Sequence, residues 1–204
     1  MGILSSTASI VRYRVSGKVD PPVNPFVEKG LVENTISDAD EGAAAKRVGW
    51  TSFQAPFQPD FSGSNFSLGA YFIFSLRIDR KVLPQKVIQK HVSIETAKRL
   101  KKSGREFLSA NEKKMIKDHV INLLNLRIPS TPHLHDVIWD HQDQTVWFFS
   151  TIKSANEDLE TLFFKSFKLS LIRLFPYTVA DLAVGLSDGQ KDVLSKISPT
   201  VFGG

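Results

Sequence analysis

Residues 68–79 constrain the fold most, because apolar side chains occupy every second position of this segment. The alternating set is Leu68, Ala70, Phe72, Phe74, Leu76 and Ile78. A period of two residues predicts a β-strand. Tyr71 and Ile73 make the opposite side apolar as well, so we expect an interior strand of a sheet rather than an edge.

Similar patterns predict the remaining elements. We expect further strands at 8–16, 46–53, 136–141 and 145–150, and helices at 24–36, 84–102, 109–125, 154–175 and 187–196. The same four residues, Ser-Ala-Asn-Glu, open the helices at 109 and at 154, where they read as capping boxes. Pro129 and Pro132 predict a loop before the strand pair. The order of the elements indicates an α+β fold, with mainly antiparallel sheets packed with helices.

The composition limits the classes of protein to which the chain can belong. A chain of 204 residues with 42% hydrophobic residues can build one large domain or two small ones. It contains no cysteine, which removes disulfides, thiolate metal sites and a cysteine nucleophile, and fits a reducing cytoplasm. We find no targeting segment, and no apolar run reaches the roughly 18 residues of a membrane helix. We therefore expect a cytoplasmic protein without a membrane partner.

The positive charge is concentrated in one segment. Residues 77–117 contain 13 Lys/Arg and four Asp/Glu, a net charge of +9, so the rest of a chain that carries +5 in total has −4. Cations three and four positions apart line up on a helix and suit a row of phosphates. Lysine outnumbers arginine, which favours contact with the DNA backbone over base reading. The candidate residues are Lys81, Lys86, Lys90, Lys98, Lys101, Lys102, Arg105, Lys113, Lys114 and Lys117.

Interpretations without a DNA-binding role stay open for some of these charges. The basic helices can simply be solvated faces, although such faces usually mix both signs. Arg12 and Arg14, on the predicted strand at 8–16, either extend the basic patch or only face solvent.

A metal-dependent nuclease is the alternative function. His133 and His135 would share one side of a strand, with Asp136, Asp140, His141 and Asp143 nearby, and such residues can bind zinc. The competing interpretation is a polar hairpin edge. The acidic residues Asp38, Asp40 and Glu41 form a second cluster, which could hold magnesium. Our main prediction includes no catalytic residue, no metal site and no cofactor.

The ordered set of motifs resembles the RdgC family of recombination-associated DNA-binding proteins. The resemblance covers roughly residues 8–182. We expect one α+β DNA-binding region at 1–182, or two subdomains at about 1–80 and 81–182, followed by a C-terminal extension at 183–204. The resemblance is carried by Ser9–Val15, Lys46–Trp50, Arg80–Ile88, Glu112–Val120 with Leu123 and Leu124, Val137–Asp140 and Ser154–Leu159. Longer relatives continue for about another hundred residues, and the loop at 125–133 departs from the family pattern.

The resemblance implies a protein that binds duplex DNA without sequence preference in recombination or replication, as a dimer or ring that restrains recombinase filaments. It implies association with the nucleoid. Some members are labelled exonucleases, but the catalytic residues that this label needs are not visible, so we expect no enzyme. Only Lys81, Lys113 and Lys117 match family positions. A further alternative is an interaction protein of a phage or mobile element that kept the fold without the DNA role.

Overall fold

The computed structural model describes residues 2–19, 21–37 and 44–197. The strands are β1 (Val11–Ser16), β2 (Lys46–Thr51), β3 (Ser67–Leu68), β4 (Tyr71–Arg80), β5 (Thr131–Asp140), β6 (Thr145–Phe148) and β7 (Ser170–Arg173). The helices are α1 (Val23–Glu33), α2 (Gln85–Ser103), α3 (Ala110–Arg127), α4 (Lys153–Phe167), α5 (Pro176–Val184) and α6 (Asp188–Lys196), with a short 3-10 turn at Ser62–Ser64. The predicted α+β class is confirmed.

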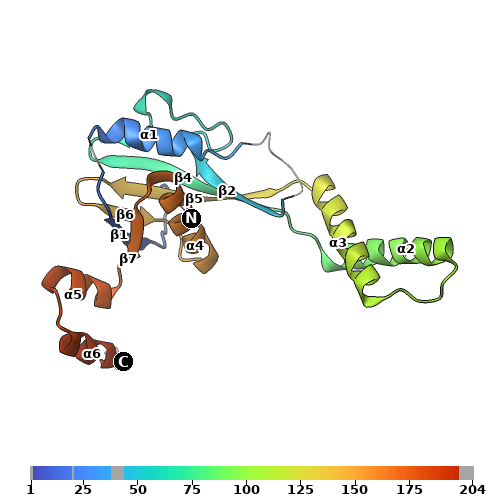
Figure 1. Ribbon diagram of the computed structural model, residues 1–204. Coiled ribbons are helices and arrows are strands. Elements are labelled where there is room, and N and C mark those ends of the chain that lie inside the picture. Colours follow the sequence, from blue (N-terminus) through green and yellow to red (C-terminus); the bar gives the residue numbers. More distant parts are fainter. Residues whose placement is uncertain (1, 20, 38–43, 198–204) are drawn as a thin grey trace.

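The described strands form one antiparallel sheet. Its order is β2-β4-β5-β6-β1-β7, and β3 pairs with the start of β4. The strand β4 lies between β2 and β5, so the prediction of an interior strand is confirmed. The sheet takes strands from both sides of residue 80, whereas residues 85–127 project from it (Figure 1).

The main core lies on the face of the sheet that α1 and α4 cover. Trp139 of β5 packs against Phe163 and Phe167 of α4, with ring centroids 5.0 and 5.2 Å apart. Phe167 also contacts Phe26 of α1 and Trp50 of β2. Because the two tryptophans and the two phenylalanines of α4 are large and almost fully buried, they supply much of the apolar burial that stabilises the sheet.

Two predictions at α4 are wrong. The helix begins at Lys153 without a side-chain cap, because the Ser154 hydroxyl accepts a hydrogen bond from Arg80 Nη2 at 3.0 Å instead. It ends at Phe167 rather than at 175, because Lys168 adopts a left-handed conformation (φ 56°) and donates its N–H to Phe164 O. The chain then forms the edge strand β7 against β1.

The predicted loop around Pro132 is also wrong, because Pro132 lies within β5 opposite Asp79. Proline has no N–H to donate to a strand ladder. The pairing of β5 with β6 is confined to residues 137–140, so at Pro132 only β4 is paired with β5. The position is therefore edge-like, and proline is tolerated there.

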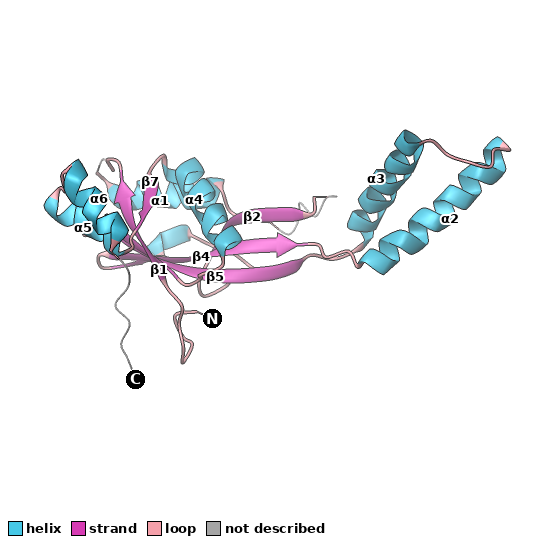
Figure 2. Cartoon of the chain, turned by 90° about the horizontal axis from the view of Figure 1, so that it is seen from below, coloured by secondary structure: helices cyan, strands magenta, loops and turns pink. Residues whose placement is uncertain are grey.

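The helices α2 and α3, with the turn between them, form a hairpin inserted between β4 and β5; we call residues 85–127 the arm. Figure 2 shows it extending away from the end of the sheet. It has its own small core, separate from the main one: Ile88, Leu108, Ile116, Val120 and Leu124. The predicted capping box opens α3, since Ser109 N donates to Glu112 Oε2 at 2.9 Å and Glu112 N to Ser109 Oγ at 3.2 Å.

At the other end of the chain, α5 and α6 project from β7 (Figure 1). The predicted helix at 187–196 is confirmed as α6, whereas α5 was not foreseen. Across the three described ranges, every helix is too short or too polar to cross a lipid bilayer.

Candidate nucleic-acid interface

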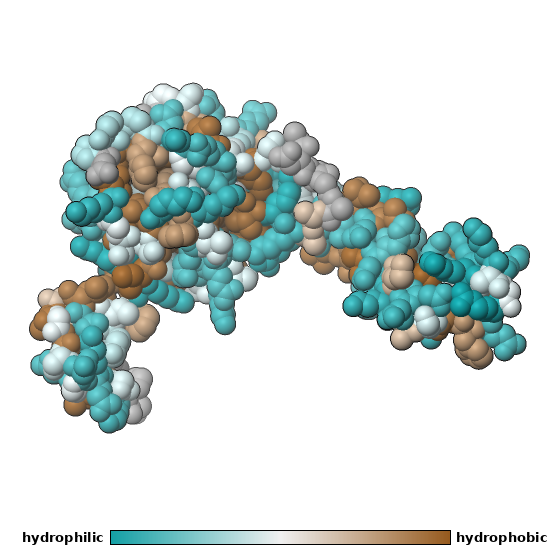
Figure 3. All heavy atoms as spheres, in the orientation of Figure 1, coloured by the Kyte–Doolittle hydropathy of each residue, from teal (hydrophilic) through white to brown (hydrophobic). Residues whose placement is uncertain are grey.

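The arm carries the positive charge of the protein. It contains eleven Lys/Arg and four Asp/Glu, a net charge of +7, whereas the other residues have 15 Lys/Arg and 17 Asp/Glu, a net charge of −2. Figure 3 shows mostly hydrophilic surface over the arm on the face in view. A projecting element with this charge can approach a polyanion without steric interference from the sheet.

Four cations share one side of α2. With about 100° of rotation per residue, Lys86, Lys90, Lys98 and Lys101 fall within about 120° of one another. All four are exposed. Ile88, which packs into the core of the arm, lies about 80° from Lys98 and about 140–160° from the other three. The apolar contact between the two helices therefore turns this basic side toward solvent.

The predicted lysines of α3 are exposed as well. Lys113, Lys114 and Lys117 occupy its first two turns. Ile116, Val120 and Leu124 of α3 are buried in the core of the arm, whereas Leu123 is 41% exposed and lines a groove between α3 and α2.

Three predicted residues have polar partners within the protein. Lys98 pairs with Glu95 at 3.2 Å, and Arg105 Nη2 with Glu112 Oε1 at 2.7 Å. Lys81 Nζ donates to the carbonyl of Asn125 at 2.6 Å, which ties the end of β4 to the end of α3. The other predicted residues, namely Lys86, Lys90, Lys101, Lys102, Lys113, Lys114 and Lys117, form no ion pair within the described part of the chain.

Arg99 is a candidate that the sequence reasoning did not select. It is exposed, and with Lys98, Lys102 and Arg105 it lines a groove of about 610 Å³ at the far end of α2. Its position between two selected lysines in the basic run was the available signal.

The exposed basic surface does not include the first arginines of the charged segment that begins at residue 77. Arg77 is only 5% exposed and bonds to Asp79 at 2.8 Å, on the sheet rather than on the arm. Arg80 contacts Ser154 and lies 3.9 Å from Asp158. The charge count of 77–117 therefore includes two arginines that belong to the sheet and not to the basic surface of the arm.

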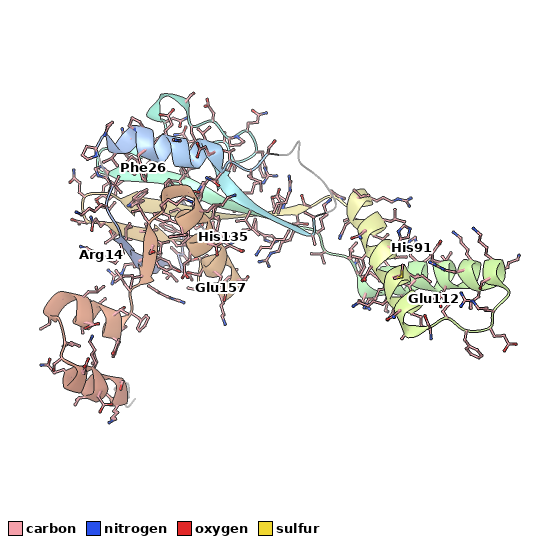
Figure 4. All side chains as sticks on the ribbon, in the orientation of Figure 1. Arg14, Phe26, His91, Glu112, His135 and Glu157 are labelled. Atoms are coloured by element: carbon pink, nitrogen blue, oxygen red, sulfur yellow. The ribbon has the colours of Figure 1, made fainter. Side chains whose placement is uncertain are left out.

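The two arginines of β1 do not extend the basic surface of the arm. In Figure 4, Arg14 lies beside the sheet on the side of α5, and His91 and Glu112 mark the arm at the opposite end of the molecule. Arg12 follows the same face of β1, two residues away.

The histidine cluster does not assemble. His133 and His135 share a face of β5, and His135 is half-buried against the ring of Phe148, with centroids 5.6 Å apart. Burial, and then the neighbouring His133, lowers the pKa of His135. Asp136 instead accepts hydrogen bonds from Ser75 and from the backbone of Ile3.

His141 of the same predicted cluster stacks on Phe72, with centroids 5.1 Å apart. Of the residues with assigned positions, no three His, Asp or Glu come together as a metal-binding group. The predicted acidic cluster of Asp38, Asp40 and Glu41 lies outside the described residues.

Comparison with known proteins gives one family. A family model described as "Putative exonuclease, RdgC" matches residues 9–182. No curated protein matches the chain.

Proposed function

Because the chain belongs to the RdgC family, we propose that it binds duplex DNA without reading its sequence and acts in recombination or replication. The observation that carries the proposal is the arm, with its net charge of +7 and seven predicted lysines that lack an ion pair among the described residues. Lysine ammonium groups act as point charges, which neutralise phosphates without a preference for particular bases.

The dimensions of the arm suit this role. The 19 residues of α2 give a helix about 28 Å long, which corresponds to about eight base-pair steps of duplex DNA. The lysines on its exposed side can therefore contact several successive phosphates. Each contact releases condensed counterions, so affinity should fall steeply with salt.

The proposal also covers the oligomeric state of the protein, its location in the cell and its protein partner. We propose that the protein works as a homodimer or ring on duplex DNA, associates with the nucleoid and restrains a recombinase filament. Light scattering of the protein with and without a duplex tests the first part, because a persistent monomer mass on DNA would contradict it.

The principal test measures the anisotropy of labelled 20-base-pair duplexes of two unrelated sequences between 50 and 300 mM KCl. With about six phosphate contacts, the log–log plot of affinity against salt should have a slope of about −5. Both sequences should bind equally. Charge reversal of Lys113, Lys114 and Lys117 to Glu should weaken binding at 100 mM KCl by at least tenfold.

A matched control changes the same net charge away from the arm. The triple variant with Glu at Lys29, Lys153 and Lys165 alters three exposed lysines of α1 and α4. It should keep most of the affinity. Equal losses in both triple variants would show that overall charge, rather than the arm, governs binding, and a salt-independent affinity would overturn the proposal.

The exonuclease description of the family needs its own assay. End-labelled duplex DNA is incubated with Mg²⁺, Mn²⁺ or Zn²⁺, with and without chelator, and the products are resolved on a gel. Our proposal predicts unchanged DNA. Chelator-sensitive cleavage that His135→Ala abolishes would favour the nuclease alternative instead.

A further inference from the structure

A second groove lies far from the arm, between the sheet and α5. It encloses about 360 Å³. Its lining residues are Arg12, Arg14, Thr145 and Leu174 on the sheet side and Val179, Leu182 and Ala183 on α5. Two guanidinium groups thus stand beside a wholly aliphatic wall.

The arginines of the groove are available to a ligand. Arg12 and Arg14 are exposed on the face of the sheet opposite the main core. Arg14 donates to the backbone carbonyl of Asp143 at 2.9 Å, a contact that leaves its charge uncompensated. Among the residues with assigned positions, neither arginine forms an ion pair with a carboxylate.

The apolar side of the groove is incompletely covered. No residue of α5 is buried, and Val179 and Leu182 are 41% and 53% exposed. Trp147, which pairs with Arg12 across the sheet, is 40% exposed. In Figure 3, apolar atoms gather over α5. An aliphatic wall beside two arginines suits a ligand that is both apolar and anionic.

We propose that this groove binds a short acidic segment of another protein. An aliphatic side chain of that segment would enter between Leu182 and the sheet. Its flanking carboxylates would pair with Arg12 and Arg14, since guanidinium groups hold carboxylates in bidentate geometry. This site is independent of the DNA-binding role proposed for the arm.

Charge and shape favour a peptide over a nucleic-acid strand. Only two cations line the groove, whereas a strand needs a continuous row of them. Aliphatic side chains also give bases no surface on which to stack.

The test uses the whole chain and a fluorescein-labelled peptide, GELDLEG, with blocked ends. We expect anisotropy to report binding with a Kd below about 1 mM. The neutral peptide GQLNLQG should bind at least tenfold more weakly. Of the three tryptophans, Trp50 and Trp139 are buried, so quenching of fluorescence by acrylamide reports mainly on Trp147, and the acidic peptide should reduce it.

Point variants distinguish peptide binding in the groove from nonspecific electrostatic attraction to the protein. Replacement of Arg12 and Arg14 together by Ala, or Leu182→Asp alone, should weaken peptide binding at least tenfold. Arg173→Ala removes an exposed arginine of β7 that points to the other face of the sheet, beside Tyr13, and should have no effect. Unchanged thermal melting confirms that each variant is folded.

Three results would overturn the proposal. The first is the absence of peptide binding to the unaltered protein at 1 mM, and the second is equal binding of the acidic and neutral peptides. The third is a single-stranded oligothymidine that displaces the peptide and loses binding when Arg12 and Arg14 are replaced, which would make the groove a nucleic-acid site.

Discussion

Arg77 and Asp79 lie two residues apart on one side of β4 and are joined by two hydrogen bonds, Nε to Oδ1 at 2.8 Å and Nη2 to Oδ2 at 3.0 Å. Both side chains are buried, and Arg47 of β2 adds a third bond to the same carboxylate at 3.1 Å. A charge count along the sequence assigns Arg77 to the basic segment, whereas its position makes it part of the sheet.

The loss of Asp79 should therefore destabilise the fold. Asp79→Ala leaves the buried Arg77 guanidinium without its carboxylate, which costs about 3–5 kcal/mol of unfolding free energy. Urea denaturation followed by circular dichroism measures it. The exposed Asp118 provides the control, because Asp118→Ala should shift stability by less than about 0.5 kcal/mol. A comparable small shift for Asp79→Ala would contradict the structural role of the pair.

Glycine 30 should resist substitution although it lies in a helix. A Cβ at Gly30 would stand 2.5 Å from Phe167 Cε1 and 2.9 Å from the carbonyl of Ser166. Alanine favours helix by about 1 kcal/mol, but overpacking costs about 1–3 kcal/mol, so Gly30→Ala should lower the melting temperature. Gly189→Ala in α6 meets no atom within 4 Å and should not lower it.

Glu112 should make the arm sensitive to acid. The bond from the Ser109 backbone, followed by Arg105, lowers the pKa of Glu112 from its ordinary 4.5 to about 2. A lowered pKa in the folded state means that the stabilisation is complete above about pH 4.5 and is lost as the pH falls through about 2. The difference in urea midpoint between the unaltered protein and Glu112→Gln should therefore shrink across that interval.

The neighbouring Glu106 is the matched control for the acid effect. It is exposed and forms no ion pair with a described residue, so Glu106→Gln should leave the urea midpoint unchanged at each pH. A difference for Glu112→Gln that persists undiminished at pH 2 would show that the carboxylate charge is not the cause.

Single lysines of the arm should act additively in DNA binding. Lys101→Ala removes one exposed cation and should reduce the salt slope by about 1, equally for every duplex sequence. Lys29→Ala, on α1 and 3.9 Å from Glu33, should leave the slope unchanged. Anisotropy titrations at several KCl concentrations measure both, and a sequence-dependent loss for Lys101→Ala would indicate base contact instead.

The two Ser-Ala-Asn-Glu segments show how far local sequence determines structure. At 109–112 the box forms as predicted, because Arg105 binds only Oε1 of Glu112 and leaves Oε2 to the Ser109 backbone. At 154–157, Arg80 takes the hydroxyl of Ser154, and the Asn156 amide donates to the carbonyls of Ser150 and Ile152. Tertiary partners, which no local pattern reveals, decide the second case.

The edge strand β7 was missed for a related reason. The apolar run that ends α4 continues through Leu169 and Leu171, so its periodicity favoured a longer helix. Leu169 is buried in the main core, and Leu171 pairs with Val15 of β1. The selected lysines of α2 and α3 are exposed, whereas Lys81, just after β4, is partly buried, and the role of all of them in DNA binding stays a prediction. The separation of the arm from the sheet was not foreseen, because charge patterns contain no information on distance.

The chain leaves the sheet after Arg80 and re-enters it at Thr131, and these two residues are direct partners in the ladder between β4 and β5. The whole arm therefore lies between two residues that are paired with each other in the sheet. The segment can consequently lengthen, shorten or exchange its charges over evolutionary time while every strand keeps its neighbour, so the surface that meets a polyanion and the scaffold that holds it are able to diverge at different rates.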